Sequence, residues 1–355
     1  MGLADDLAVV VVAKYLEEVE LIANESVDII RRWLDSVGLT LADHKTEVLL
    51  VSRRKEVTVK VGSQAVESKD EIKYLGVWLD TKLNFKAHTK HACEKASKTY
   101  NALARMLANT GGPRSSRRML LARVITSSLL YGAQIWADAL KLQENKRKMQ
   151  SVQRLTAMRV ISAFRTVSGD AANVIAGMLP VNIAAGEAKR LFMAKLIEST
   201  TQEDKRRERA MSMQTWQESW DSSQKGRWTH RLIPNIEKWT TRKHGELNYH
   251  LTQFLTGHGG YRQYLHRFGH DDSPLCRTCG ETEDVEHVFT KCPRFLEERR
   301  PLPTTPNGGI VAENIVDEML RSEETWNTVC SVIRRINEKL REIEKIRRDN
   351  LAQGP

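Results

Sequence analysis

The sequence predicts an α+β protein, in which a short region of strands around one helix precedes a longer helical region and a small cysteine-rich module. Three observations support this fold class. β-Branched apolar runs and turn signals alternate within the first 80 residues, and apolar residues recur at helical spacing over most of the remaining chain. Three cysteines and a histidine gather between residues 276 and 292.

The first 80 residues are predicted to hold one helix among several strands. The continuous apolar run at 7–13 is typical of a buried strand, and the Ala4-Asp5-Asp6 turn precedes it. Apolar residues at spacings of three and four predict a helix over 16–37, which Gly38 ends. Further strands are expected at 46–52, 57–61 and 72–79.

After residue 80 the pattern is mostly helical, with helices expected at about 86–108, 115–140, 143–163 and 184–200. The charged run at 201–209 is expected to be a linker. Four tryptophans interleaved with Lys and Arg follow it, and they fit either a packed helical module or a stacking surface, of which packing is favoured. Heptad-like spacing from Trp326 to Ile343 predicts a C-terminal helix docked against its own domain.

Composition indicates a folded protein. Of 355 residues, 41% are hydrophobic and 28% charged, which excludes collagen-like and wholly disordered chains. The apolar run near the start is far shorter than the roughly 20 residues that span a bilayer, so neither a secretory nor a membrane segment is expected. Five cysteines without a disulfide framework indicate a reducing, intracellular compartment.

The net charge of +10 is unevenly distributed. Residues 1–100 carry 15 basic and 16 acidic side chains, residues 101–265 carry 26 and 12, and residues 266–355 carry 14 and 17. A polyanion is the natural partner of the middle third, because Lys and Arg contacts to phosphates release counterions. A merely solubilising surface is the alternative that composition leaves open.

The first motif is the acidic pair Asp5-Asp6 ahead of an apolar run. Two adjacent carboxylates at a hairpin tip repel one another, and a divalent cation such as Mg²⁺ with its preference for oxygen ligands is a fitting partner. Asp271-Asp272 is a second such pair, but no strand follows it, so it serves as an internal contrast.

The order of motifs after this pair points to one family. Asp5-Asp6 is followed by the predicted helix, then Leu41-Ala42-Asp43-His44-Lys45-Thr46, then Tyr74-Leu75-Gly76. This order resembles the second half of the palm in reverse transcriptases of non-LTR (LINE-like) retrotransposons, especially the type-1 elements that insert into ribosomal DNA. Leu130-Tyr131-Gly132 with Trp136, and Gly177-Met178-Leu179-Pro180, resemble thumb-region segments of the same family.

The resemblance implies an RNA-directed DNA polymerase acting in target-primed reverse transcription. Asp5 and Asp6 would bind two Mg²⁺ ions, and Lys45 would lie near the leaving phosphates. Tyr74, Leu75 and Gly76 would hold the primer end. Arginines of the thumb would track the template–primer backbone, namely Arg114, Arg117, Arg118 and Arg123. The implied partners are an RNA template, a DNA primer or target and dNTPs, with no membrane, in the nucleus.

The chain departs from the family pattern in two ways. Leu3 stands where the family has Tyr or Phe. The family's third metal-binding carboxylate lies on an earlier palm strand, so we expect this chain to be the C-terminal portion of a Pol polyprotein and inactive alone. The fingers and, in type-1 elements, the endonuclease are expected upstream.

The cysteine-rich module has the spacing Cys276-x₂-Cys279-x₇-His287-x₄-Cys292. Three thiolates and an imidazole suit a closed tetrahedral Zn²⁺ site of structural type, and Pro274 and Gly280 permit the tight turn. The motif is similar to the Cys-Cys-His-Cys motif near the C-terminus of non-LTR retrotransposon proteins. Cys93 and Cys330 fall on helical stretches and are expected in the core.

The predicted division is a partial palm at 1–80, a helical thumb and connection at 81–200, a basic Trp-containing module at 201–265, a zinc module at 266–300 and a helical segment at 310–350. Two other functions stay open. The chain could bind RNA or DNA through its thumb and zinc module without catalysis, or it could be a helical scaffold whose nucleic-acid binding is weak and insensitive to salt.

Overall fold

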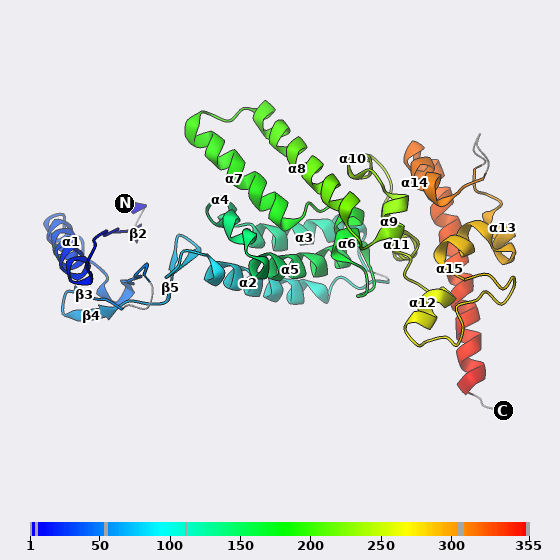
Figure 1. Cartoon of the computed structure of the whole chain (residues 1–355), viewed down its shortest axis with the longest axis horizontal. Coiled ribbons are helices and arrows are strands. Elements are labelled where there is room, and N and C mark those ends of the chain that lie inside the picture. The colour runs from blue at the N-terminus through cyan, green and yellow to red at the C-terminus, as the bar shows by residue number, and fades with distance from the viewer. Residues whose placement is uncertain (1, 4–5, 53–55, 111, 304–308, 353–355) are drawn as a thin grey trace. The chain divides into compact units, whose positions relative to one another are not determined.

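The computed structural model describes residues 2–3, 6–52, 56–110, 112–303 and 309–352. The chain divides into two units, an N-terminal unit at 1–92 and a C-terminal unit at 93–355 (Figure 1). The N-terminal unit mixes short strands with one long helix, and the C-terminal unit is helical. The α+β fold class is therefore confirmed, whereas the finer division of the C-terminal unit stays a prediction.

The strands are two to four residues long and all lie in the N-terminal unit: β1 (Gly2–Leu3), β2 (Asp6–Leu7), β3 (Thr58–Val61), β4 (Gln64–Glu67), β5 (Glu71–Tyr74) and β6 (Val77–Asp80). The helices are α1 (Leu16–Ser36), α2 (Lys86–Ala104), α3 (Ser115–Leu129), α4 (Ala133–Trp136), α5 (Gln143–Ile161), α6 (Gly169–Ala176), α7 (Val181–Ile197), α8 (Gln202–Ser222), α9 (Arg227–Leu232), α10 (Ile236–Thr240), α11 (Tyr249–Thr256), α12 (Arg262–Arg267), α13 (Leu296–Arg299), α14 (Ala312–Arg321) and α15 (Glu323–Ala352).

The described residues of the N-terminal unit include three antiparallel hairpins, β1–β2, β3–β4 and β5–β6, and the helix α1. Helix α1 lies along the outer edge of β3. Its side chains accept hydrogen bonds from that edge, since the backbone N–H of Lys60 donates to Asn24 at 2.7 Å and that of Thr58 donates to Glu20 at 3.4 Å. These bonds satisfy donors that an open strand edge would leave to water.

Three of the predicted strands differ from the structure. The strand at 7–13 ends at Leu7, and Val10 and Val12 are 80% and 87% exposed, so the apolar run is not buried here. Within 46–52, Val48 makes one isolated bridge to Ser68. The range 72–79 is a hairpin rather than one strand. Periodicity cannot reveal these outcomes, because a strand also needs a partner.

The C-terminal unit is built around one hydrophobic core whose buried side chains run from Ala122 to Leu340. Helix α5 packs against α3 and α6, and α7 and α8 form an antiparallel pair (Figure 1). Trp216, Trp220 and Trp239 are at most 3% exposed within this core. The favoured interpretation of the tryptophans as packing residues is therefore confirmed for these three.

Two predictions in this unit are wrong. The helix expected at 115–140 is interrupted, because α3 ends at Leu129 and Gly132, with a φ of +66°, is the N-cap of the separate helix α4. The run at 201–209 is the start of α8 rather than a linker. Thr201 and Asp204 form a reciprocal capping box, and Arg207 pairs with Asp204 at 2.8 Å, so local capping and ion pairs make the charged sequence helical.

The C-terminal helix α15 packs against α11, α13 and α14, as its apolar spacing predicts. Trp326, Val329, Ile333, Ile336 and Leu340 are each at most 3% exposed, and Ile343 is 38% exposed. No helix in the described part of the chain combines the length and apolar character needed to cross a bilayer.

Candidate functional site

The four residues of the cysteine-rich motif converge on one point of the C-terminal unit. The ligand atoms of Cys276, Cys279, His287 and Cys292 all lie within 4.8 Å of one another. The Sγ atoms of Cys276 and Cys292 are 3.7 Å apart, and Cys279 Sγ is 3.2 Å from His287 Nε2. A tetrahedral zinc ion with Zn–S bonds of about 2.3 Å requires sulfur atoms about 3.8 Å apart. The residues therefore fit a structural zinc ion.

The local backbone explains how the ligands meet. A bridge between Leu275 and Thr282 closes a loop in which the N–H of Cys276 donates to Glu281 and that of Gly280 donates to Cys276. Gly280 has a φ of +75°, a conformation that favours glycine, as its predicted role in the turn requires. A single π-helical turn over His287–Lys291 then brings Cys292 back to the cluster, with its N–H bonded to the His287 carbonyl.

Burial sets the protonation of this cluster. Desolvation lowers the pKa of His287, which favours the neutral imidazole that a metal requires. Burial alone would raise the pKa of Cys276, but hydrogen bonds from the backbone N–H groups of Thr278 and Cys279 hold it below its usual value. The two buried thiols differ, because burial raises the pKa of Cys292 to about 11, so only at Cys276 does the surrounding protein favour the thiolate that ligates a metal.

The other two cysteines are isolated from this cluster. Cys93 lies on α2 and Cys330 on α15, both partly buried, and desolvation raises the pKa of their thiols to about 11 and about 12. These values agree with packing residues rather than ligands or nucleophiles.

Two buried ion pairs brace the metal-binding loop, and the sequence motifs did not predict them. Arg262 contacts Asp271 at 2.7 Å and Asp272 at 3.0 Å, and the Asp271 side chain is 1% exposed. Arg294 contacts Glu283 at 2.8 Å, and the Glu283 side chain is 2% exposed. The acidic and basic residues interspersed around the motif were the sequence signal that could have indicated these ion pairs. The contrast pair Asp271-Asp272 is thus bound to an arginine.

The acidic hairpin is described in part. Asp5 lies outside the described residues. Asp6 begins β2, pairs with Leu3 of β1 and is exposed. Lys45 ends a short 3₁₀ turn and is also exposed. The roles that the resemblance implies for these residues stay predictions.

Tyr74, Leu75 and Gly76 form the tight turn between β5 and β6. Tyr74 pairs with Val77, so Leu75 and Gly76 are the two turn residues, with φ values of +45° and +83°. Positive φ at both positions is the geometry of a type I′ hairpin, which strains a leucine. The motif predicted to hold a primer end therefore includes both turn residues of the β5–β6 hairpin.

The four predicted phosphate-binding arginines do not behave alike. Arg114, Arg117 and Arg123 are exposed on or beside α3. Arg118 is 3% exposed and donates to the backbone carbonyls of Pro113 at 2.7 Å and Arg159 at 3.1 Å. Arg118 is thus an internal brace, and the prediction that it tracks a phosphate backbone is wrong because its donors are already used.

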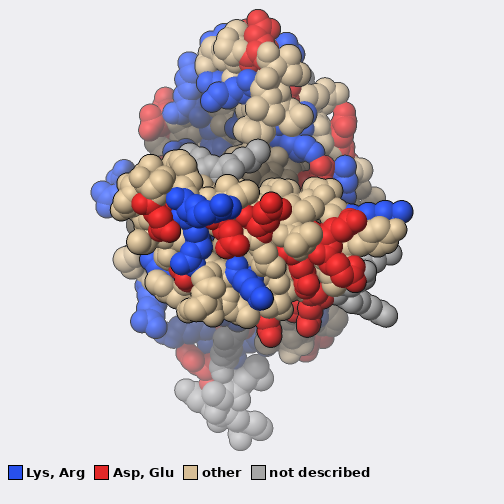
Figure 2. Space-filling model, turned by 90° about the vertical axis from the view of Figure 1, so that its left-hand side faces the viewer, with Lys and Arg blue, Asp and Glu red and all other residues tan. Residues whose placement is uncertain are grey.

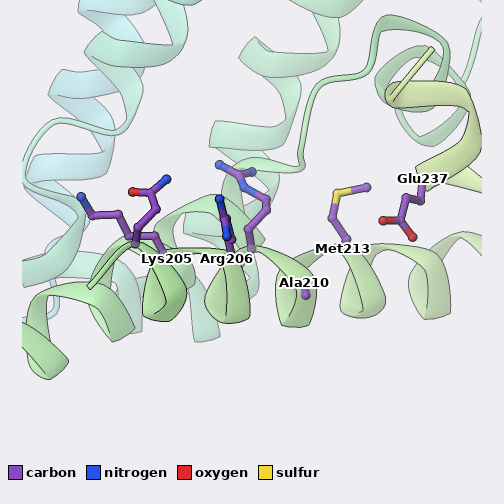
Figure 3. Close-up of a pocket in the computed structure, with 7 residues that line it drawn as sticks. Lys205, Arg206, Ala210, Met213 and Glu237 are labelled. Carbon is purple, nitrogen blue, oxygen red and sulfur yellow. The ribbon is translucent and has the colours of Figure 1, made fainter. Parts of the chain in front are cut away.

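Charged side chains lie on one displayed face of the N-terminal unit (Figure 2) and line one pocket of the C-terminal unit. Figure 2 shows basic and acidic side chains mixed on the near face, where the N-terminal unit lies, with acidic ones gathered to one side. A pocket of about 360 Å³ opens along α8, and Figure 3 shows Lys205, Arg206 and Glu237 directed toward it. Arg209, which also lines this pocket, forms an ion pair with Glu187 at 3.0 Å, so part of the positive charge of the pocket is neutralised.

Comparisons with known proteins agree with the sequence motifs. The chain is 28% identical over 316 residues to a 115 kDa protein in the type-1 retrotransposable element R1DM of Drosophila melanogaster. It is 27% identical over 362 residues to a Retrovirus-related Pol polyprotein from the element R1 2 of Nasonia vitripennis, and 24% identical over 321 residues to one from the element R1 of Bradysia coprophila.

These alignments cover 83%, 94% and 84% of the chain, and 31%, 88% and 32% of the respective relatives. The chain thus spans about a third of the Drosophila and Bradysia proteins. No family model matches it, and no solved structure does. Its homologues are Pol polyproteins and related proteins of R1 type-1 retrotransposable elements from several insects, and this similarity supports the resemblance of the chain to non-LTR R1 retrotransposon proteins.

Proposed function

We propose that this chain forms part of an RNA-directed DNA polymerase that acts in target-primed reverse transcription. The observation that carries the proposal is the 27% identity to a Pol polyprotein over 94% of the chain, together with the ordered motifs of the N-terminal unit. The nuclear location and the nucleic-acid partners follow from this proposal and stay predictions.

In the proposed reaction, Asp5 and Asp6 would hold Mg²⁺, which would supply positive charge to offset the negative charge of the triphosphate. The exposed position of Asp6 on β2 leaves its carboxylate accessible to such an ion. Lys45 stabilises charge on the leaving pyrophosphate. The β5–β6 hairpin offers Tyr74 and its turn as a support for the primer end.

The surface of the N-terminal unit supports action within a larger assembly. Helix α1 buries none of its residues, and Leu21, Ile29 and Trp33 on it are 69%, 53% and 57% exposed. With Val10 and Val12, these side chains form more exposed apolar surface than a small isolated domain tolerates well. Further palm segments of a longer polyprotein are the proposed cover.

Primer extension tests the proposal. The chain, alone and within a Pol polyprotein of the length of the Drosophila relative, is incubated with an RNA template, a DNA primer, dNTPs and Mg²⁺. Replacing both Asp5 and Asp6 by asparagine should lower incorporation at least about a hundredfold, because metal-held charge stabilisation is worth several kcal/mol. Asp35→Asn on α1 is the matched control and should leave incorporation unchanged.

The second candidate function is nucleic-acid binding without catalysis, which the basic middle of the chain favours. RNA binding with a steep salt dependence but no incorporation in either protein would establish this alternative. Equal incorporation after loss of both aspartates would contradict the polymerase proposal.

A further inference from the structure

Five aromatic rings form a continuous path on the C-terminal unit. Phe164, which follows α5, lies 5.9 Å from Tyr249 of α11 and 6.3 Å from Tyr264 of α12, measured between ring centroids. Tyr264 in turn lies 4.9 Å from Phe268 and 5.1 Å from His258. We call Tyr249, Phe164, Tyr264, Phe268 and His258 the aromatic strip.

The aromatic strip is accessible, unlike the tryptophans of the core. Phe268 is 42% exposed, and the other four side chains are half-buried. The Tyr264 hydroxyl lies 2.8 Å from the Thr166 hydroxyl, which fixes the ring at the surface. His258 Nδ1 donates to the Thr256 carbonyl at 2.8 Å, and burial with nearby Arg267 lowers its pKa, so this ring is neutral near pH 7.

Arginines stand at both ends of the strip. The Arg341 guanidinium on α15 lies 4.8 Å from the Tyr249 ring centroid, and that of Arg267 lies 5.8 Å from the Phe268 ring. Arg165 follows Phe164 and is exposed. Among the residues that the structure describes, no carboxylate lies within 4 Å of these three guanidinium groups, so their charge is available to a ligand.

We propose that the aromatic strip binds single-stranded nucleic acid, with bases stacked on its rings and phosphates held by Arg165, Arg267 and Arg341. Accessible rings interleaved with arginines that form no printed ion pair suit the two features of a single strand, since every base has a π-face and every linkage a negative charge. A duplex hides its base faces and cannot use the rings. This inference rests on the proposed function, which it deepens by naming the strand form that is bound.

Fluorescence anisotropy with labelled ten-nucleotide oligothymidylate and oligouridylate tests the proposal on the full chain. Phe268→Ala should weaken binding about five- to a hundredfold while the slope of log affinity against log salt stays unchanged, because stacking involves no counterion. Arg267→Gln should instead reduce that slope by about 0.7. Phe192→Ala is the matched control, since Phe192 is 40% exposed on α7, outside the strip.

A second measurement reports on stacking directly. Oligonucleotides that carry 5-iodouracil should photocross-link to peptides within residues 249–268, and the yield should fall in Phe268→Ala but not in Phe192→Ala. Circular dichroism melting is the control that checks whether each variant is folded.

Three outcomes would overturn the proposal. Phe268→Ala could bind as tightly as Phe192→Ala, or a ten-base-pair duplex could compete as well as the single strand. In both cases the chain binds nucleic acid and the proposed function survives. If the wild-type chain binds neither form, the strip and the nucleic-acid part of the proposed function fail together.

Discussion

Replacing Cys279 by serine should separate metal binding from folding in the cysteine–histidine cluster. Cys279 is the exposed member of the four, whereas Cys276 and Cys292 are 2% and 0% exposed. Removing a residue that only hydrogen-bonds to a metal ligand already lowers metal affinity 10–100-fold. Removing the ligand itself should therefore lower the zinc affinity by more than about a hundredfold. The variant should therefore purify with less than stoichiometric zinc.

The fold around the cluster should persist without the metal. Val288, Phe289 and Phe295 are each at most 3% exposed and belong to the common core of the C-terminal unit. Burying three such side chains contributes about 5–9 kcal/mol. The loop that carries Cys279 has fewer such anchors. The shared core therefore limits the expected loss of structure to this loop.

Thermal unfolding measures how much bound zinc stabilises the chain. With a chelator, wild type and Cys279→Ser should unfold within about 1 kcal/mol of each other. With free zinc at 100 times the wild-type Kd, the wild type should gain about 2.7 kcal/mol and the variant almost nothing. That gain corresponds to roughly 5–10 °C in Tm for a unit of this size. Cys330→Ser, which removes a cysteine outside the cluster, is the control and should keep its zinc.

Two results would refute this reasoning. Stoichiometric zinc in Cys279→Ser would remove that residue from the ligand set. Loss of hydrogen-exchange protection over residues 285–300 in the metal-free wild type would show that the metal, rather than the core, holds the segment.

Local geometry supports three further predictions. Gly245→Ala should destabilise the chain by more than about 2 kcal/mol in thermal unfolding, because its φ is +90° and an added Cβ would overlap the Trp326 ring. Gly269→Ala is the control, because Gly269 has a similar φ of +69° but lies in open space, and it should cost about 1 kcal/mol. Leu75→Gly should stabilise the N-terminal unit by about 1 kcal/mol in the same assay, since it relieves a strained φ of +45°, and a destabilised variant would contradict the strain. The arginine partner Arg262 holds the pKa of the Asp271 carboxylate well below 3.8. The ionised carboxylate should therefore stabilise the fold above about pH 4, and this stability should be lost as the pH falls further. Asp271→Asn should flatten the dependence of the unfolding free energy on pH in that range.

Residue spacing predicted the features that depend on neighbours along the chain. The helical periodicity of 16–37 and the apolar spacing after Trp326 correspond to α1 and α15. The cysteine and histidine spacing identified four side chains that converge on one point. Gly280 was assigned to a tight turn, and its positive φ agrees. Each of these features is set within a few residues of sequence.

Spacing failed where a distant segment decides the outcome. The apolar run at 7–13 has the composition of a buried strand, yet Val10 and Val12 are exposed in the absence of a cover. Arg118 looks like its surface neighbours in the sequence, but four backbone carbonyls surround its guanidinium. Thr201 could have signalled the start of α8, since its capping box with Asp204 is visible in the sequence.

By itself, the sequence determined the family resemblance, the candidate zinc ligands and the buried face of the C-terminal helix α15, because periodicity and spacing encode local geometry directly. Only the tertiary structure decided which arginines are buried, which acidic residues brace the metal-binding loop and which aromatic rings meet at the surface. Those outcomes depend on hydrogen-bond partners and burial supplied by residues far apart in the chain, as when Phe164 and Tyr264 come together across a hundred positions. No local pattern carries that information.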